Sequence, residues 1–172
     1  MNPIFENKSE ITLEKYIHQC NNPVGRKAKR SLKRWKTTQI SGMVVMFIIT
    51  AMAVSYKAYP IALVAGLFVL AFIANLTVVQ KSRYKQQYNN IVAQYPDGKW
   101  VRTITFDKDI KVTDGGQVSS FRYYEFNRLE ENNKYYLLYK NENAAFRIEK
   151  GAFTVGKEEK FARFIKSKIK TQ

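Results

Sequence analysis

Two long apolar runs, separated by a short polar turn, dominate the middle of this 172-residue chain. Ile40–Tyr56 and Pro60–Val79 contain no charged residue, and Lys57 in the turn is the one charge between residues 40 and 79. As α-helices the runs would rise roughly 26 Å and 30 Å, close to the thickness of a bilayer's hydrocarbon core, about 30 Å. The pattern therefore predicts a transmembrane helical hairpin over residues 40–80, with helices at about 40–57 and 60–79.

A soluble helical core and a signal peptide both fit this pattern less well. A buried helical pair in a soluble core would leave too little chain to cover it, and soluble helices alternate apolar and polar faces more clearly. A cleaved signal peptide does not fit a run that begins at residue 40 and is followed by a second apolar span.

Basic residues flank the hairpin on both outer sides, in a chain whose formal net charge is +15. Such a block can bind nucleic acid, but beside an apolar run it favours anionic lipid headgroups. Since cytoplasmic flanks carry the excess of Lys and Arg, we expect a multi-pass cell-membrane protein with both termini cytoplasmic. We expect no nucleic-acid partner, and the candidate anionic-lipid contacts are Arg26, Lys27, Lys29, Arg30, Lys33, Arg34, Lys36, Lys81, Arg83 and Lys85.

Within the second span, four residues are candidates for a helix interface. Ala58, Ala62 and Gly66 recur every four residues and form a smooth stripe, which favours packing against the first helix or, alternatively, dimerisation. Asn75 is a polar side chain near the inner end of the span, where a bond across the hairpin or contact with interfacial water is more typical than substrate binding.

Residues 1–39 are expected to form a cytoplasmic N-terminal arm with two helices. Thr12 fits the N-cap of a short helix over residues 12–20, which Pro23 ends. A second helix is expected from Val24 through the basic block into the first span. His18 and Cys20 have no partner of their kind elsewhere, so we interpret them as surface or packing residues.

The chain after the hairpin changes from helical to strand-like patterning. Residues 81–96 are expected to be a helical connector, which Pro96-Asp97-Gly98 ends. Period-two patterns then predict strands at Trp100–Phe106, Ile110–Thr113, Gln117–Phe126, Tyr135–Lys140 and Ala144–Glu149, with a turn at Glu130–Asn133. For Gln117–Phe126, a break near Tyr124 is the alternative to a continuous strand. In the last hairpin, Tyr135, Leu137 and Tyr139 are expected to share a face with Ala144, Phe146 and Ile148.

An amphipathic helix is expected at Lys157–Ile169, with Phe161, Phe164, Ile165 and Ile169 on its apolar stripe. The fold class is therefore α+β: the membrane hairpin is followed by a small antiparallel β-sheet domain at 97–172, capped by this C-terminal helix.

The whole architecture resembles the YcxB-like family of bacterial membrane proteins. The resemblance in motif lies in Ile104–Ile110, Tyr123–Glu131, Tyr135–Tyr139 and the Phe153–Phe164 tail, while Glu149-Lys150-Gly151-Ala152 departs from the family's Ile-Pro-Lys. It implies a cytoplasmic domain similar to pleckstrin-homology (PH) folds, and it carries over no catalytic residue.

Catalytic and metal-binding patterns are missing from the sequence. One His and one Cys do not make a catalytic triad, no phosphate-binding loop is present, and Asp107, Asp109 and Asp114 miss the EF-hand spacing. Tyr-rich strands with nearby Arg are typical of a nucleic-acid platform, but core packing explains them better. We therefore expect no enzyme and no cofactor.

Three functions are left open at this point. The first is a non-enzymatic membrane protein that presents its cytoplasmic domain to a protein partner or to lipid headgroups. The second is an immunity or resistance protein against a membrane-active bacteriocin or secreted toxin. The third is an accessory subunit of a transporter or membrane enzyme. The expected partners are the lipid bilayer, a membrane or cytoplasmic protein, and in one alternative a second copy of the chain.

Overall fold

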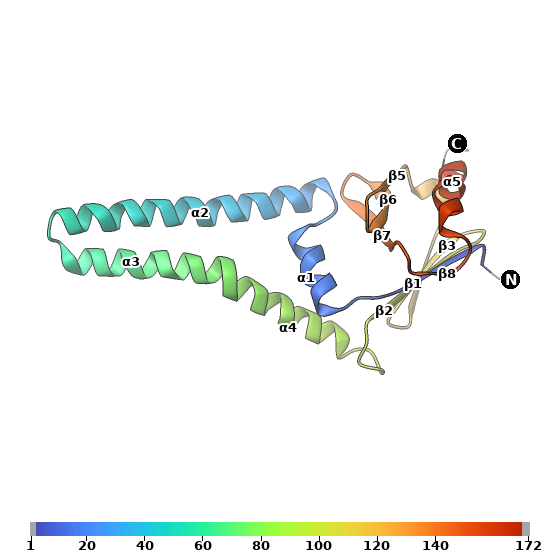
Figure 1. The fold of residues 1–172 in the computed structure, drawn as a ribbon, viewed down its shortest axis with the longest axis horizontal. Coiled ribbons are helices and arrows are strands. Elements are labelled where there is room, and N and C mark those ends of the chain that lie inside the picture. The colour runs from blue at the N-terminus through green and yellow to red at the C-terminus, as the bar shows by residue number, and fades with distance from the viewer. Residues whose placement is uncertain (1–2, 170–172) are drawn as a thin grey trace. The chain divides into compact units, whose positions relative to one another are not determined.

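The computed structural model describes residues 3–169, which form two compact units (Figure 1). One unit is the chain up to Arg26 together with the chain from Tyr88 onward, and the other is Lys27–Gln87. The fold is mixed α+β, with two long apolar helices, antiparallel strands and a C-terminal helix, as expected. The N-terminal segment up to Arg26 thus belongs to the same unit as the sheets.

The helical unit is built on two long runs. Helix α2 (Arg26–Ser55) carries the basic block straight into the first apolar run, as predicted. Helix α3 (Tyr59–Ala74) continues through the π-helix η1 (Asn75–Val79) into α4 (Gln80–Val92). Both runs are long and apolar enough to cross a membrane. Between them Lys57 adopts a left-handed φ of 57°, and the Ala58 N–H donates to the Ala53 carbonyl at 2.8 Å.

The strands form two antiparallel sheets, rather than the single sheet that was expected. The five-stranded sheet has the order β4-β3-β2-β1-β8, with β1 (Phe5–Glu10), β2 (Val101–Phe106), β3 (Ile110–Asp114), β4 (Gln117–Phe121) and β8 (Phe153–Val155). The three-stranded sheet has the order β5-β6-β7, with β5 (Arg128–Glu131), β6 (Tyr135–Asn141) and β7 (Ala144–Glu149).

Strand β1 is the main correction to the expected N-terminal arm. It pairs with β2 over six residues, from Phe5 with Phe106 to Glu10 with Val101, and with β8 on its other side. The chain then enters α1 (Leu13–Asn21), whose N-cap Thr12 accepts a hydrogen bond from the Lys15 backbone N–H at 3.4 Å, as predicted. Residues 5–10 are therefore an inner strand of the sheet, not part of a separate arm.

Several strand details also differ from the sequence predictions. The expected strand Gln117–Phe126 ends at Phe121, and the 3-10 helix η2 (Tyr123–Glu125) lies at the alternative break near Tyr124. The expected turn at Glu130–Asn133 begins later, because β5 runs to Glu131. The pairing of β6 with β7 joins Tyr136 to Ile148 and Leu138 to Phe146, so the even-numbered residues of β6 share the face of Phe146 and Ile148. The expected facing of Tyr135, Leu137 and Tyr139 was wrong.

The hydrophobic core lies between the two sheets and helix α5 (Glu158–Ile169). Phe161 and Ile165 of α5 are fully buried, and Phe164 and Ile169 pack against the same core, which confirms the predicted stripe. The Phe161 ring lies 4.9 Å from Phe106 and 5.5 Å from Phe5, in edge-on geometries that aromatic pairs favour. This core also includes Tyr123 and Tyr136, and Tyr139 is buried too, so three tyrosines of the segment considered for a nucleic-acid platform are buried.

Candidate functional site

Helices α2 and α3 expose most of their large apolar side chains. Phe47 is 66% exposed and Leu63 is 65% exposed, and only 6% and 11% of the most apolar windows of the two helical runs are buried. The other exposed large apolar residues of this surface are Ile40, Val44, Val45, Ile48, Ile49, Met52, Val54, Tyr56, Tyr59, Ile61, Val64, Leu67, Phe68, Leu70, Ile73, Val78 and Val79. A surface of this kind is larger than soluble monomers normally expose.

A narrow seam of small residues joins α2 to α3. Ala53 of α2 and Ala62 and Ala65 of α3 are buried there. Of the predicted stripe, Ala62 is thus buried, whereas Ala58 and Gly66 are only half-buried. A Cβ atom added to Gly66 would meet nothing within 4 Å, so the described contacts leave open space beside it. Ala65, three residues after Ala62, is the seam residue that the four-residue spacing missed.

Asn75 bonds across to the other helix. Its Nδ2 donates to Oε1 of Gln39 at 2.9 Å, which is one of the two roles favoured from the sequence. Asn75 also begins the π-helix η1, whose C-cap Gln80 donates its backbone N–H to the Asn75 carbonyl. Gln39 lies at the polar end of the first apolar run, and no signal in the sequence pairs these two amides.

The ten candidate lipid-contact cations all have exposed side chains, seven on the first turns of α2 and three on α4. Between them on α2, Leu32, Trp35 and Gln39 are half-buried. Arg26 also forms an ion pair with Glu142 at 3.2 Å. The cations therefore lie at the ends of the apolar surface and are exposed there.

The folded unit contains an open cleft of about 550 Å³ between its sheets. Side chains of the five-stranded sheet, of β7 and of the end of α4 line it: Ile91, Gln94, Tyr95, Trp100, Arg102, Val112, Asp114, Gly115, Gln117, Ser119, Phe121, Ala145 and Phe146. The volume lies within the range of small-molecule and peptide pockets, about 300–1,000 Å³.

Asp114 is the charged centre of this cleft. It accepts hydrogen bonds from the Tyr95 hydroxyl, from Trp100 Nε1 at 2.6 Å, and from Arg102 Nε and Nη2 at 2.8 and 2.5 Å. Burial alone would raise the pKa of Asp114, but the hydrogen bond from Tyr95 and the charge of Arg102 outweigh it and lower that pKa. Burial, together with the bond to Asp114 and its negative charge, raises the pKa of Tyr95 to about 12.

These contacts indicate that the Asp114 network stabilises the fold and does not transfer protons. An ionised carboxylate that already accepts four hydrogen bonds has little capacity left to remove a proton from a ligand. The donors to Asp114 lie on β2 and in the chain between α4 and β2. The network therefore holds the segment that leads into β2 against β3. Arg102 and Asp114 neutralise each other, and the cleft that remains is uncharged and partly aromatic.

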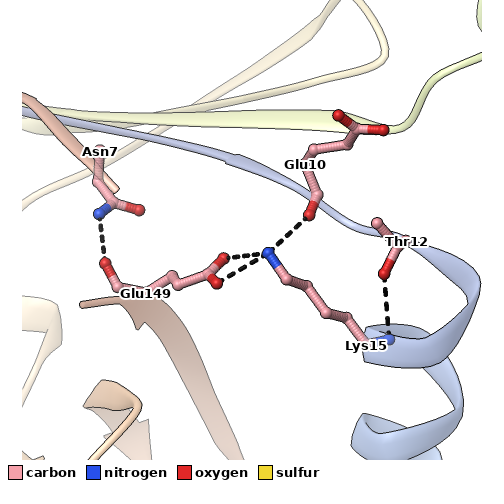
Figure 2. A network of polar contacts seen from close by, with 5 residues as sticks. All are labelled: Asn7, Glu10, Thr12, Lys15 and Glu149. Atoms are coloured by element: carbon pink, nitrogen blue, oxygen red, sulfur yellow. Dashed lines mark hydrogen bonds and ion pairs between the residues drawn. The ribbon is translucent and has the colours of Figure 1, made fainter. Parts of the chain in front are cut away.

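A second polar network ties the N-terminal segment to β7 (Figure 2). Lys15 Nζ lies 2.8 Å from both carboxylate oxygens of Glu149 and donates to the Glu10 carbonyl at 3.1 Å. Asn7, which is 1% exposed, donates its Nδ2 to the Glu149 carbonyl at 2.8 Å, while its Oδ1 has no partner among residues 3–169. A second cleft, of about 440 Å³, borders this network at Lys15, His18 and Tyr135.

Metal-ligating side chains do not cluster in the part of the chain that the structure describes: no group of three or more His, Cys, Asp or Glu residues is placed to hold an ion. Comparison with protein-family models, curated proteins and solved structures gives no match to this chain. Function is therefore inferred from the exposed apolar surface, its basic ends and the cleft.

Proposed function

We propose that this protein is a non-enzymatic, multi-pass protein of the bacterial cell membrane, in which a helical hairpin anchors an α+β interaction domain. The observation that carries the proposal is the exposed apolar surface of α2 and α3. It covers every side of the helices except the narrow seam at Ala53, Ala62 and Ala65. Lipid is the environment in which such a surface is stable.

The energetics of insertion support this anchor. Twelve residues of Pro60–Val79 are Leu, Ile, Val or Phe. At roughly −0.3 to −0.6 kcal/mol each near the helix centre, they favour insertion by about 4–7 kcal/mol. The polar groups at the ends of the span have partners, since Asn75 bonds to Gln39 and the Thr77 hydroxyl donates to the Ile73 carbonyl at 2.8 Å. Because these side chains are hydrogen-bonded, they oppose the transfer of the helix into lipid less than unpaired polar groups would.

The exposed cations give the anchor its proposed direction. Seven of them precede the first apolar run and three follow the second, whereas the turn between the runs has only Lys57. By the positive-inside rule, both termini and the folded unit belong in the cytoplasm. Each Lys or Arg near an anionic leaflet contributes about 1 kcal/mol of attraction.

The folded unit then serves as the interaction domain. Its neutral, partly aromatic cleft between the sheets supports binding of a protein segment more than binding of charged headgroups, because Arg102 is neutralised by Asp114. The resemblance to the YcxB-like family, and with it the PH-like character of this unit, stays a prediction.

Membrane extraction tests the anchor. Membranes from cells that express the full chain are washed with high salt and then with alkaline carbonate, which strip peripheral proteins. We expect the protein to stay in the pellet and to be released by detergent. A variant with Val45→Arg and Leu67→Arg should lose this retention, while Val155→Arg in the folded unit should keep it. Release of the unaltered chain by carbonate contradicts the proposal.

Crosslinking in native membranes tests the interaction domain. Ala145→Trp fills the cleft, whereas Ala144→Trp, the preceding and exposed residue, leaves it open. We expect mass spectrometry to identify crosslinked partner proteins that Ala145→Trp loses and Ala144→Trp keeps. If both variants gave the same crosslinked proteins, the partner would not bind in the cleft.

A further inference from the structure

Strand β4 is a free edge of the five-stranded sheet. It pairs with β3 in an unbroken register from Gln117 opposite Asp114 to Phe121 opposite Ile110. Within residues 3–169 no strand pairs with its other side. Because alternate backbone N–H and C=O groups of an edge strand point away from the sheet, β4 presents a template for one more strand.

This edge lacks the features that normally prevent pairing. Residues 117–121 read Gln-Val-Ser-Ser-Phe, with no charge and no proline, and the register shows no bulge. Val118 is 64% exposed. Each of the other described strands with four or more residues carries at least one Lys, Arg, Asp or Glu, and the opposite edge strand β8 has only three residues. Natural edge strands are usually protected by charge, proline, bulges or shortness.

We propose that β4 pairs with β4 of a second copy of this chain, antiparallel and about a two-fold axis at Ser119. This register sets Ser119 opposite Ser119, Val118 opposite Ser120, and Gln117 opposite Phe121 of the second copy. No charged residue meets another, and the two five-stranded sheets become one continuous sheet. The interface is isologous, which is the usual form of a two-fold dimer.

The lack of charge on β4 favours this surface over others for pairing with a second copy. Two chains of net charge +15 repel each other wherever their exposed cations meet. On the outer face of the neighbouring strand β3, Lys111 lies opposite Ser120, and Arg122 directly follows β4, three residues from the proposed axis. In the proposed dimer the two Lys111 residues are three strand spacings and two residues apart, or about 16 Å. That exceeds the Debye length of about 8 Å at physiological salt, so their repulsion is largely screened.

Pairing at β4 also has a consequence for the cleft. Gln117, Ser119 and Phe121 line the cleft from the inner face of β4. In the dimer these residues of the two copies lie side by side, and the two clefts become neighbours across the new strand pair. The pairing of β4 does not depend on the helices crossing a bilayer, because it involves the sheet alone.

Cysteine crosslinking of the full-length protein in detergent tests the register. In a Cys20→Ser background, Ser119→Cys places two thiols directly opposite, with Cα atoms about 4.5–5.5 Å apart, which a disulfide can bridge. We expect Ser119→Cys to form a covalent dimer with copper–phenanthroline as oxidant. Lys111→Cys is also exposed but too distant, and it should stay monomeric. Crosslinking of Lys111→Cys without Ser119→Cys would overturn the register.

Solution mass tests the interface itself. In the variant with Val118→Lys and Ser120→Lys, each new lysine lies directly opposite a new lysine of the second copy. We expect this repulsion to raise the dimer Kd by about tenfold or more. A variant with Tyr124→Lys and Val155→Lys adds the same charge elsewhere and should leave the Kd unchanged. Circular dichroism checks that both variants fold. A monomer at all concentrations, a dimer indifferent to the β4 lysines, or a different protein bound at β4 overturns the proposal.

Discussion

Replacing Gly42 with alanine tests how closely α2 and α3 pack. A Cβ atom at this position would lie 2.7 Å from Cζ and 3.0 Å from Cε1 of the Phe72 ring. Carbon atoms in good contact are about 3.5–4.0 Å apart, so the ring must move by about 1 Å. Overpacking of this kind costs about 1–3 kcal/mol, and the lower part of that range applies because the ring can swing.

Gly66→Ala is the matched control. Both glycines lie inside helices, where alanine favours the helix by about 1 kcal/mol, and a Cβ at Gly66 meets nothing within 4 Å. The helix propensity gain is common to both variants, so the difference in stability between them isolates the contact with Phe72. We expect Gly66→Ala to be about 1–2 kcal/mol more stable than Gly42→Ala.

Thermal unfolding in one detergent, followed by circular dichroism, measures this difference. For a chain of this size about 1 kcal/mol corresponds to about 2–4 °C in Tm. The double variant Gly42→Ala with Phe72→Leu should recover part of the loss, since the shorter side chain relieves the overlap. If Gly66→Ala is instead the less stable variant, the predicted stripe through Gly66, and not the seam through Ala65, is the packing surface.

Three further predictions concern the folded unit. Phe161→Ala removes a fully buried ring and should cost about 3–5 kcal/mol in urea unfolding, whereas Tyr124→Ala, at a 54% exposed position, should change stability by about 0.5 kcal/mol or less. The raised pKa of Tyr95 means that the unfolded chain loses this proton first, so stability falls as pH rises from about 10 to about 12, and Tyr95→Phe should lessen that fall. The lowered pKa of Asp114 has the opposite effect on stability. The stabilisation by Asp114 is present above its unfolded pKa of about 4 and is lost as pH falls through its folded pKa. Asp114→Asn should therefore lessen the loss of stability in acid.

Long periodic segments were predictable from the sequence. The apolar runs predicted α2 and α3, because an uncharged run of this length fits a membrane-spanning helix. The stripe at Phe161 and Ile165 predicted α5, because apolar residues at a helical period over three turns rarely fit another structure. Strands β2, β3, β6 and β7 followed from alternation and from turn residues between them.

Strand β1 could not be predicted in this way. Residues 5–10 read Phe-Glu-Asn-Lys-Ser-Glu, and their second inward position is Asn7 rather than an apolar residue. Hydrogen bonding to β2 and β8 on both sides stabilises this strand, and neither partner is near it in sequence. Tertiary contacts of this kind override a local pattern. Strand β8, with three residues, is too short for any period to show.

Strand register and hydrogen-bonded pairs of side chains distant in sequence could not be predicted either. A shift by one residue turns every side chain of a strand to the other face, which is how the facing of β6 was mistaken. Asn75 was identified as a polar residue in need of a partner, but its partner Gln39 could be found only in the folded structure. The same holds for Asp114, which was considered from the sequence only as a metal ligand and which is the centre of a four-bond network.

The most direct test of the membrane anchor is the accessibility of single cysteines in intact cells. Cys20 is the only cysteine of the chain, so Cys20→Ser gives a clean background. With a membrane-impermeant maleimide, we predict labelling of Lys57→Cys from outside, labelling of Asp97→Cys only after permeabilisation, and protection of Phe47→Cys in both conditions. Labelling of Asp97→Cys from outside would reverse the orientation, and ready labelling of Phe47→Cys in intact membranes would contradict a membrane-spanning hairpin.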